Sequence, residues 1–591
     1  MSINPFERIL ERSRARRIAA VIWLAFVILL GRLWQLQIAQ GDEFLRQSEV
    51  NRRRLIRVRA PRGVILDRKG RTIATSRPRF VVSVIPERIQ GSPDGIRRLS
   101  GILQIPEKDL RATIERKQTI KGAPVRVADN ADFNIVVQVE EQKLLMPGVS
   151  VELDQARYYP NGNLFCHVLG YLREIDKDEL DARPKTYRPG DFIGKSGLEK
   201  RYDDMLHGTD GGKSIEVNAH GVRTRLLGDQ KSISGKTMVL SLDTNLQAAA
   251  EKAIGQKVGA VVALSPRTGE VLALLSKPDF DSNNIGTEWG KIATNKFHPL
   301  QNRAVGSKYP PGSTFKIVTA SAGLKNGAIT TQSAVHCSGS YRIGRYRKRC
   351  WKVHGGVDFY TAISQSCDVF FYVAGRKLGI SKLADMAFAF GLGKKTGIDL
   401  PSERAGTIPT EQWKKNLYHE SWYPGDTVNC SIGQGFVQAT PLQMAMVAAA
   451  IANDGRIMRP HILREIRDPH GKVIRRIAPE LLSTIPISQS DIAQIKKAMR
   501  ETVIGKGGTG HVVNMQGVTV AGKTGSAEDP PRRMPHAWFV CFAPVENPQI
   551  AICVFREQGG HGGTEAGPIA RAMLEAWFHT KAVNERVGRT D

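Results

Sequence analysis

The chain has 591 residues, 41% of them hydrophobic, with 57 glycines and 30 prolines. This length is too great for a single hydrophobic core, so we expect about two to four domains, and the composition excludes a disordered or fibrous protein. The formal net charge of +28 favours an anionic partner. Because no zinc-finger, homeodomain or ribonucleoprotein pattern occurs, we exclude nucleic acid and expect a membrane surface or an anionic envelope polymer.

The N-terminal segment joins positive charge to an apolar run. Four arginines lie within residues 12–17, and an uninterrupted apolar stretch follows over 18–31. A bilayer needs roughly 20 apolar residues, so Arg32 must reach the far interface for the span to be complete. A cleaved signal peptide is the alternative, but Gln37 stands where a cleavage site carries a small residue. We therefore predict an uncleaved anchor over 18–39, with its arginine-rich side in the cytoplasm.

The part of the chain after the anchor mixes short predicted strands with charged helices. Residues 62–70 have strand character followed by a turn, and 107–116 is predicted to be a helix. No catalytic constellation occurs in this part. The predicted divisions are a cytoplasmic tail over 1–17, the anchor over 18–39, a stalk over 40–60, a pedestal domain for dimerisation or interaction over 61–235, a second domain over 236–580 and a C-terminal tail over 581–591.

The second domain is predicted to contain an antiparallel sheet with an inserted helical lobe. Two strands come first, helices fill the middle, and three strands and a helix close the domain. The whole chain is therefore assigned to the α+β class. The predicted elements of the sheet layer are a helix over 245–254, strands over 259–264, 270–275, 518–521, 537–542 and 550–555, and a closing helix over 568–578.

Three short motifs occur in a diagnostic order. They are Ser-Thr-Phe-Lys at 313–316, Ser-Cys-Asp at 366–368 and Lys-Thr-Gly at 523–525. Each alone is weak, because a chain of this length contains such triplets by chance. Together, the order S-x-x-K, S-x-[N/D], K-T-G is typical of serine acyl-transferases that react with penicillin.

The first motif predicts a nucleophile and its base. Ser313 is expected to begin a helix, where the helix dipole stabilises negative charge on its oxygen. Lys316 lies at i+3, on the same face, so its amine can reach that oxygen. A lysine must be neutral to act as a base, and Lys523 is the candidate cationic neighbour that favours the neutral form.

The other two motifs supply a proton shuttle and a substrate-binding edge. Ser366 is assigned as the shuttle to the leaving amine. Asp368 is expected to orient Lys316 or to bind the substrate, and helix capping is the structural alternative.

Thr524, together with Lys523, can hold a terminal carboxylate, and Gly525 lets a substrate strand approach closely. The backbone N–H groups of Ser313 and Ser526 are the expected oxyanion donors.

Seven cysteines raise the question of disulfides or metal. Cys337, Cys350, His354 and Cys367 have a spacing that suits a closed Cys3His zinc shell, and a metal there would hold the Ser366 loop. One disulfide with a free thiol is the competing interpretation; we favour structural zinc because His354 completes a set of four ligands. No organic cofactor is expected. The remaining cysteines are predicted to be core residues: Cys166, Cys430, Cys541 and Cys553.

Over nearly its whole length the chain resembles the class B penicillin-binding proteins, and within them the elongation type. Asp368 stands where many relatives have Asn, which is similar to the elongation type rather than the division type. The stretches that carry the resemblance are 60–68 and 197–199 in the pedestal, and 309–316, 433–435, 440–444 and 536–539 in the second domain.

The resemblance implies an inner-membrane protein with a periplasmic serine D,D-transpeptidase domain, of the carboxypeptidase class, that β-lactams inhibit. Ser313 would be acylated by the penultimate D-Ala of a peptidoglycan stem peptide, and the amine of a second stem peptide would form the cross-link during cell elongation. The resemblance also implies a polytopic glycan polymerase and a periplasmic shape-determining scaffold as partners. A zinc site beside the second motif also occurs in elongation-type relatives.

Several alternatives remain open. A division-specific transpeptidase would use the same chemistry. A D,D-carboxypeptidase or β-lactamase would pass the acyl group to water, and a β-lactam sensor would use acylation as a signal.

Overall fold

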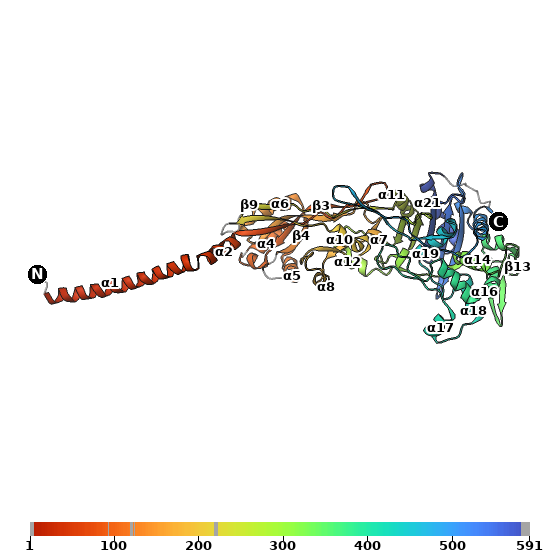
Figure 1. Ribbon diagram of the computed structural model, residues 1–591, viewed down its shortest axis with the longest axis horizontal. Helices are drawn as coiled ribbons and strands as arrows, with labels where there is room; N and C mark the ends of the chain where they lie inside the picture. Colours follow the sequence, from red (N-terminus) through yellow and green to blue (C-terminus); the bar gives the residue numbers. More distant parts are fainter. Residues whose placement is uncertain (1–4, 93, 119–121, 123, 218–222, 581–591) are drawn as a thin grey trace. The chain divides into compact units, whose positions relative to one another are not determined.

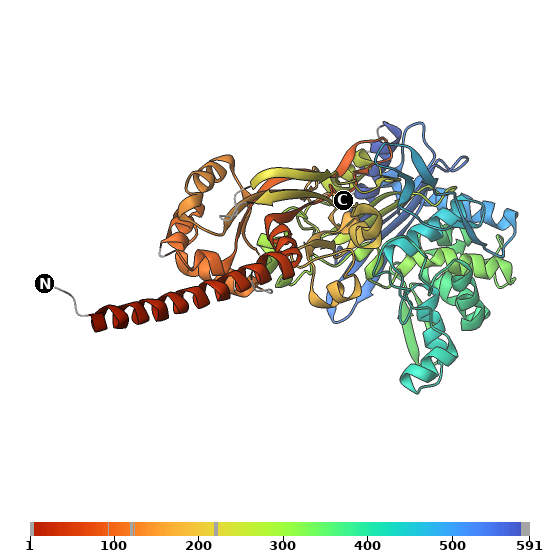
Figure 2. The same cartoon turned by 60° about the vertical axis from the view of Figure 1, so that its left-hand side comes forward.

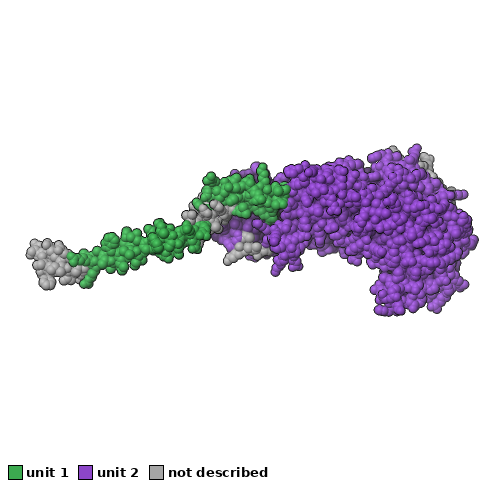
Figure 3. Space-filling view, in the orientation of Figure 1, with its two compact units in different colours: residues 1–61, 209–233 green, residues 62–208, 234–591 purple. Residues whose placement is uncertain are grey.

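The computed structural model describes residues 5–92, 94–118, 122, 124–217 and 223–580. It divides into two compact units, coloured separately in Figure 3. Unit 1 comprises residues 1–61 and 209–233, and unit 2 comprises residues 62–208 and 234–591. All the predicted catalytic, substrate-binding and metal-binding residues therefore belong to unit 2.

Unit 1 begins with a long helix. Helix α1 (Pro5–Trp34) continues through the π-helical turn η1 (Gln35–Ala39) to helix α2 (Gly41–Arg52). Residues Ala15–Ala39 are long and apolar enough to cross a membrane. The predicted anchor therefore coincides with one continuous helical segment.

The rest of unit 1 is a three-stranded antiparallel sheet in the order β1-β8-β9. Strand β1 (Arg53–Val58) pairs with β8 (Gly211–Val217), and β8 pairs with β9 (Arg223–Gln230). The predicted stalk thus ends in a strand. Its partner lies far along the chain, so no local pattern in the sequence indicates the pairing.

The pedestal part of unit 2 packs three helices against a sheet. Long antiparallel strands form the sheet, and alternate residues such as Val82 and Val84 are buried against the helices. The elements are β2 (Ile65–Leu66), β3 (Thr72–Val84), β4 (Val125–Ala131), β5 (Val149–Tyr158), α4 (Gly95–Leu103), α5 (Glu107–Lys117) and α6 (Phe133–Glu141).

Strand β10 joins the pedestal to the second domain. Strand β10 (Thr237–Leu240) pairs in parallel with β2 and antiparallel with β18 (Leu463–Arg467). The pedestal sheet therefore runs on into strands from the second domain, in the order β19-β18-β10-β2-β3-β4, with β19 spanning Val473–Arg476.

The second domain contains the predicted five-stranded antiparallel sheet, in the order β12-β11-β23-β22-β21. The predicted strand 518–521 is displaced, because the strand begins at Ala521 and includes the Lys-Thr-Gly motif. Glycines in a motif lower its strand propensity, and here pairing with β22 overrides that preference. The strands are β11 (Gly259–Leu264), β12 (Val271–Lys277), β21 (Ala521–Asp529), β22 (Arg532–Ala543) and β23 (Ile550–Arg556).

Helices cover both faces of this sheet. Val261 and neighbours on one face pack against α11 (Thr244–Ile254) and α21 (Gly567–Phe578), which lie side by side in Figure 1. Val262 and the alternate residues pack against α19 (Pro441–Ala452), whose residues are all buried. The helical lobe, green to light blue in Figure 2, comprises α14 (Lys316–Lys325), α15 (Phe359–Ser364), α16 (Asp368–Ala389), α17 (Glu411–Tyr418), α18 (Pro424–Ser431) and α20 (Gln489–Ile504).

Candidate active site

Ser313 lies in a tight turn rather than at the first residue of an α-helix. The 3₁₀ turn η3 (Gly312–Phe315) carries it, and α14 begins only at Lys316. Gly312 has φ +54°, and a Cβ there would lie 2.7 Å from the carbonyl oxygen of Ser526. Only glycine fits this approach. Since residues i and i+3 eclipse in a 3₁₀ helix, the turn still places Ser313 and Lys316 on one side.

Lys316 is completely buried and its amine is fully engaged. Its Nζ donates to the carbonyl oxygen of Ser366 at 2.9 Å, to the Ser366 Oγ at 3.2 Å and to the Asp368 Oδ1 at 2.6 Å. These bonds match the three donors of an ammonium group. Within the described residues Lys316 makes no hydrogen bond to Ser313, so the two predicted partners share the site without direct contact.

Ser366 occupies an unusual backbone conformation. It has φ +58°, in the left-handed region, between helices α15 and α16. A serine there costs about 1–2 kcal/mol and persists only where the surroundings impose it. The conformation presents both the hydroxyl and the carbonyl of Ser366 to Lys316.

Asp368 is the first residue of helix α16, and the capping position belongs to Cys367. The capping alternative for Asp368 is therefore wrong. Its carboxylate pairs with Lys316, while its backbone N–H donates to the Cys350 Sγ at 3.2 Å. Two roles were predicted for Asp368, orienting Lys316 and binding the substrate, and this contact is consistent with the first.

Lys523 and Thr524 project from edge strand β21. Lys523 is fully buried and donates to the carbonyl oxygen of Thr524 at 3.0 Å. Burial lowers the pKa of Lys523 well below its ordinary value, the charge of Lys316 lowers it further, and Asp368 opposes both. Burial and the neighbouring charge therefore favour a neutral amine on Lys523.

The residues after Lys523 form one wall of a cleft of about 980 Å³. A Cβ on Gly525 would lie 3.0 Å from the Thr314 Cγ2, so this strand is tightly packed behind the wall. The Ser526 Oγ lies 3.5 Å from the His561 Nδ1. Besides Thr524, Gly525 and Ser526, the cleft is lined by Ser313, Ser366 and Asp368. The structure therefore brings the three motifs to one cavity.

Two residues that line this cavity could not be identified as site residues from the sequence. The Thr509 Oγ1 lies 2.7 Å from the Thr524 Oγ1, and His561 faces Ser526. Neither belongs to a recognisable motif, so only the tertiary fold identifies them. Gln434, which also lines the cleft, lies in the 433–435 stretch that carried the family resemblance.

The four predicted metal ligands converge on one point. The ligand atoms of Cys337, Cys350, His354 and Cys367 all lie within 4.8 Å of one another. They come from separate segments, with Cys337 at the end of strand β13 (Ala334–Cys337). All seven cysteines of the chain are free thiols.

The surroundings of His354 suit a metal ligand. Its Nδ1 lies 3.5 Å from the Cys337 Sγ and 3.6 Å from the Cys350 Sγ, while its Nε2 lies 3.2 Å from the carbonyl oxygen of Gln365. A metal-ligating histidine usually donates its other ring N–H to such a carbonyl. A hydrogen bond from Cys367 lowers the pKa of Cys350, which favours a thiolate. The residues therefore fit a zinc ion.

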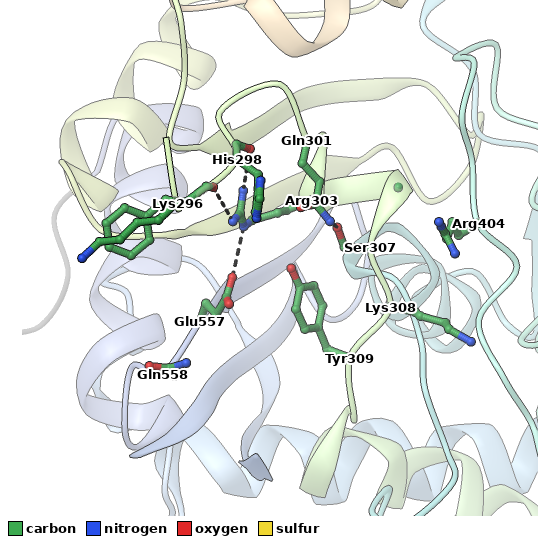
Figure 4. A pocket seen from close by; sticks show the side chains of 12 residues that line it. Lys296, His298, Gln301, Arg303, Ser307, Lys308, Tyr309, Arg404, Glu557 and Gln558 are labelled. Atoms are coloured by element: carbon green, nitrogen blue, oxygen red, sulfur yellow. Dashed lines mark hydrogen bonds and ion pairs between the residues drawn. The ribbon is translucent and has the colours of Figure 1, made fainter. Parts of the chain in front are cut away.

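A second pocket of about 610 Å³ adjoins the cleft, and Figure 4 shows its side chains. It shares Lys308, Tyr309 and Glu557 with the larger cleft that Ser313 lines. Buried Arg303 donates to Glu557 at 3.1 Å and to the Phe297 carbonyl oxygen at 2.8 Å. Burial raises the pKa of Tyr309 to about 12, and the nearby Glu557 adds to the shift. This ion pair fixes the end of the cleft beside Tyr309.

The comparisons with known proteins cover both parts of the chain. The model of the penicillin binding protein transpeptidase domain matches residues 259–575, and that of the penicillin-binding protein dimerisation domain matches residues 57–240. The peptidoglycan D,D-transpeptidase MrdA of Acinetobacter baumannii is 35% identical, over 98% of this chain and 89% of its own length.

Two solved structures are also similar. The complex between PBP2 and MreC from Helicobacter pylori has a TM-score of 0.78 at 28% identity and covers 89% of this chain and 99% of that chain. A structure entitled "Structural coordination of polymerization and crosslinking by a peptidoglycan synthase complex" has a TM-score of 0.72 at 30% identity, over 97% of this chain and 99% of that chain. These matches confirm the resemblance seen in the motifs: the chain belongs to the class B penicillin-binding proteins, and within them to the elongation-type peptidoglycan D,D-transpeptidases.

Proposed function

We propose that Ser313 is the nucleophile of this transpeptidase and that Lys316 takes its proton. The observation that carries the proposal is the buried amine of Lys316, held by Ser366 and Asp368 behind the cleft that Ser313 lines. Catalytic hydrogen bonds are often incomplete without substrate, so a direct bond between Lys316 and Ser313 is expected only in the complex.

The two lysines divide the proton between them. Burial and the charge of Lys316 disfavour a proton on Lys523, and Asp368, which pairs with Lys316, offsets this only in part. A substrate whose terminal carboxylate binds at Lys523 and Thr524 supplies the missing negative charge. Lys523 then holds the proton, and Lys316 acts from its neutral form.

The acylation step follows from this arrangement. The Ser313 Oγ bonds to the carbonyl carbon of the penultimate D-Ala while its proton passes to the Lys316 Nζ. The backbone N–H groups of Ser313 and Ser526 stabilise the oxyanion. The C–N bond to the terminal D-Ala then breaks, and Ser366 passes the proton from Lys316 to the leaving amine. An amine of a second stem peptide resolves the ester.

Mass spectrometry of the full-length protein after incubation with penicillin tests the nucleophile. We expect one covalent adduct, located on the peptide that contains Ser313, and none in the variant Ser313→Ala. Ser321→Ala is the matched control, because Ser321 is a buried serine of α14 that bonds only within its own helix. An adduct that persists in Ser313→Ala would overturn the assignment.

The fate of the acyl group separates transfer from hydrolysis. Full-length protein given glycan strands with pentapeptide stems is expected to form cross-linked dimers. If tetrapeptide alone accumulates, the chain acts as a carboxypeptidase. Depletion in cells distinguishes the biological process, because loss of an elongation enzyme gives spheres and loss of a division enzyme gives filaments.

We propose that zinc binds Cys337, Cys350, His354 and Cys367 as a structural ion. When bound, zinc would hold three segments together and fix the loop of Ser366, since Cys367 is its neighbour in sequence. Elemental analysis of the purified protein should give about one zinc per chain. Cys350→Ser should lose the zinc, melt at a lower temperature and acylate more slowly, whereas the buried core variant Cys430→Ala keeps the metal. A protein purified without chelators that contains no zinc contradicts the proposal.

We also propose that α1 anchors the chain in the inner membrane with its N-terminus in the cytoplasm. The four arginines within residues 12–17 support this orientation. Because the related PBP2 of H. pylori was solved with MreC, and another relative within a peptidoglycan synthase complex, a shape-determining scaffold and a glycan polymerase are the proposed partners. Topology reporters fused to each end test the orientation.

A further inference from the structure

A strongly basic hairpin stands beside the catalytic cleft. Strands β14 (Ser340–Ile343) and β15 (Tyr346–Arg349) form it, and we name residues 340–352 the basic hairpin. The sequence contains no acidic residue between Ser333 and Val357. The six cations of the basic hairpin are Arg342, Arg345, Arg347, Lys348, Arg349 and Lys352.

These charges are arranged at a cost to the fold. Arg342 lies directly opposite Arg347 in the strand pairing, and like charges in such a pair are destabilising. Within the residues that the structure describes, none of the six cations forms an ion pair with a carboxylate. Arg347 instead donates to the Ser340 hydroxyl at 2.7 Å. A repulsion between cations that no carboxylate in the described residues relieves points to a function.

The base of the basic hairpin is hydrogen-bonded to residues on either side of Ser366. The indole N–H of Trp351 donates to the Gln365 carbonyl oxygen at 3.1 Å, and the Tyr372 hydroxyl donates to the Arg349 carbonyl oxygen at 3.2 Å. Lys348, Arg349 and Trp351 line the cleft itself. The outer part is exposed, with Tyr346 62% accessible. The hairpin is thus a fixed, cationic extension of the wall that carries Ser366.

The position of Ser366 assigns this side of the cleft to the second substrate. The leaving amine and the incoming amine occupy the same place relative to the acyl carbon, and one shuttle serves both. In the proposed function the first stem peptide would run along β21, with its terminal carboxylate at Lys523 and Thr524 and its reacting carbonyl oxygen at the Ser526 N–H. The second peptide must therefore enter past Ser366, where the basic hairpin lines the path.

We propose that the basic hairpin binds the carboxylates of the acceptor stem peptide and so directs the acyl group to an amine instead of water. This proposal rests on the proposed function. In the step concerned, the acceptor amine nitrogen bonds to the acyl carbon, the C–O bond to the Ser313 Oγ breaks, and the amine proton passes through Ser366 and Lys316 to that oxygen. The hairpin takes no part in the bond changes; it raises the local concentration of the acceptor.

The double variant Arg342→Gln/Arg347→Gln tests this proposal in the full-length protein. Neither residue lines the cleft, and the substitutions remove a like-charge pair, so the variant should melt no lower than the parent. The donor is a glycan strand with pentapeptide stems; the acceptor is a strand with tetrapeptide stems, with free or amidated carboxylates. The matched control is Lys472→Gln/Arg475→Gln, in the exposed hairpin of β18 and β19 outside the cleft.

We expect the ratio of cross-linked product to hydrolysed tetrapeptide to fall about three- to tenfold in the variant, as for two exposed charge contacts. Labelling by penicillin keeps its parental rate, the control behaves as the parent, and amidation of the acceptor lowers the parental ratio to that of the variant. Added salt weakens the parental preference.

An unchanged ratio in the variant overturns the proposal, as does an amidated acceptor that works as well as the free one. A defect seen only in cells, with normal cross-linking by purified protein, also overturns it and assigns the hairpin to an acidic protein partner. Failure of the proposed function gives a different result, because penicillin would then not label Ser313 in the parent.

Discussion

Two of the clusters of buried charge within unit 2 differ in how their charges are paired. In the pedestal, Arg62 contacts Glu199 at 2.8 Å and Asp203 at 2.7 Å, and Arg157 contacts Glu199 at 2.6 Å. Arg183 also contacts Asp203, at 2.9 Å, so each arginine there has a carboxylate in direct contact. In the catalytic cleft, Lys316 and Lys523 share Asp368.

The difference in balance separates a structural cluster from a reactive one. Burial opposes charge on Arg62 and on Glu199, but their partners outweigh it, so the pKa of Arg62 is raised and the pKa of Glu199 is lowered. Both groups are fixed in their charged forms. Lys523 has the opposite outcome, because burial and the repulsion from Lys316 lower its pKa. Of these two clusters, the one in the cleft is therefore the one in which burial favours the neutral form of a basic group.

Removing the lysine of the unbalanced cluster should have the largest effect. Lys316→Met is expected to slow acylation by penicillin by roughly 10²–10⁴-fold, the range for loss of a general base. Stopped-flow measurement with a fluorescent penicillin gives the rate. Lys325→Met, an exposed lysine at the end of the same helix, should react as the parent does. Parental kinetics in Lys316→Met would remove this lysine from the mechanism.

Breaking the balanced cluster should damage stability instead of chemistry. Glu199→Gln leaves Arg62 and Arg157 without their shared carboxylate, and we expect a loss of about 3–5 kcal/mol in the free energy of unfolding. Denaturant titration of the full-length protein in detergent measures it. Glu107→Gln, which breaks only the exposed pair with Arg111, should cost less than about 1 kcal/mol.

The pH dependence of Glu199→Gln provides a second check. The pKa of Glu199 lies below its ordinary value of 4.5, so the unfolded chain binds more protons in acid. The stabilisation is therefore complete above the unfolded pKa and is lost as pH falls through the folded one. Parent and variant should converge in acid. A constant difference down to low pH would mean that packing, not charge, holds the cluster.

The smallest expected effect is a change in how steeply the free energy of unfolding depends on pH in the alkaline range. Since the folded pKa of Lys523 lies below the ordinary value of 10.5, the unfolded chain binds more protons between these values. Stability of the parent should rise with pH through that window, by at most about 1.4 kcal/mol per pH unit. Lys523→Met lacks this contribution, so its stability relative to the parent is greatest below the folded pKa of Lys523 and falls as pH rises toward 10.5. Parallel curves contradict the assignment of the neutral amine.

Much of the sheet layer could be predicted from local patterns. The strand at 259–264 is a continuous apolar run that is buried at every residue, and the helix α11 buries Leu246, Ala250 and Ile254 at helical spacing. The boundaries of β21 could not be predicted in this way, because Gly522 and Gly525 disfavour a strand. The strand forms there because it pairs with β22. The turn at Ser313 was missed for a similar reason: it depends on Gly312 approaching the carbonyl of Ser526.

The candidate site likewise has features that the sequence predicts and features that depend on the tertiary fold. The spacing of Ser313, Ser366 and Lys523 predicts the chemistry, but not the lowered pKa of Lys523, because that shift depends on burial and on neighbouring charge in three dimensions. Thr509 and His561 come from distant loops, and no motif marks them.

Strand β21 is the outermost strand of its sheet, and this has a consequence for drug resistance. An inhibitor that pairs with the main chain of an edge strand contacts groups that every amino acid carries. Replacing a side chain does not remove such a contact, so escape requires moving the strand. Substitutions at the two glycines that pack this strand are also restricted, because a Cβ at Gly312 would lie 2.7 Å from the carbonyl oxygen of Ser526 and a Cβ at Gly525 would lie 3.0 Å from the Thr314 Cγ2. Compounds anchored to this backbone should therefore retain activity longer than those that depend on side chains.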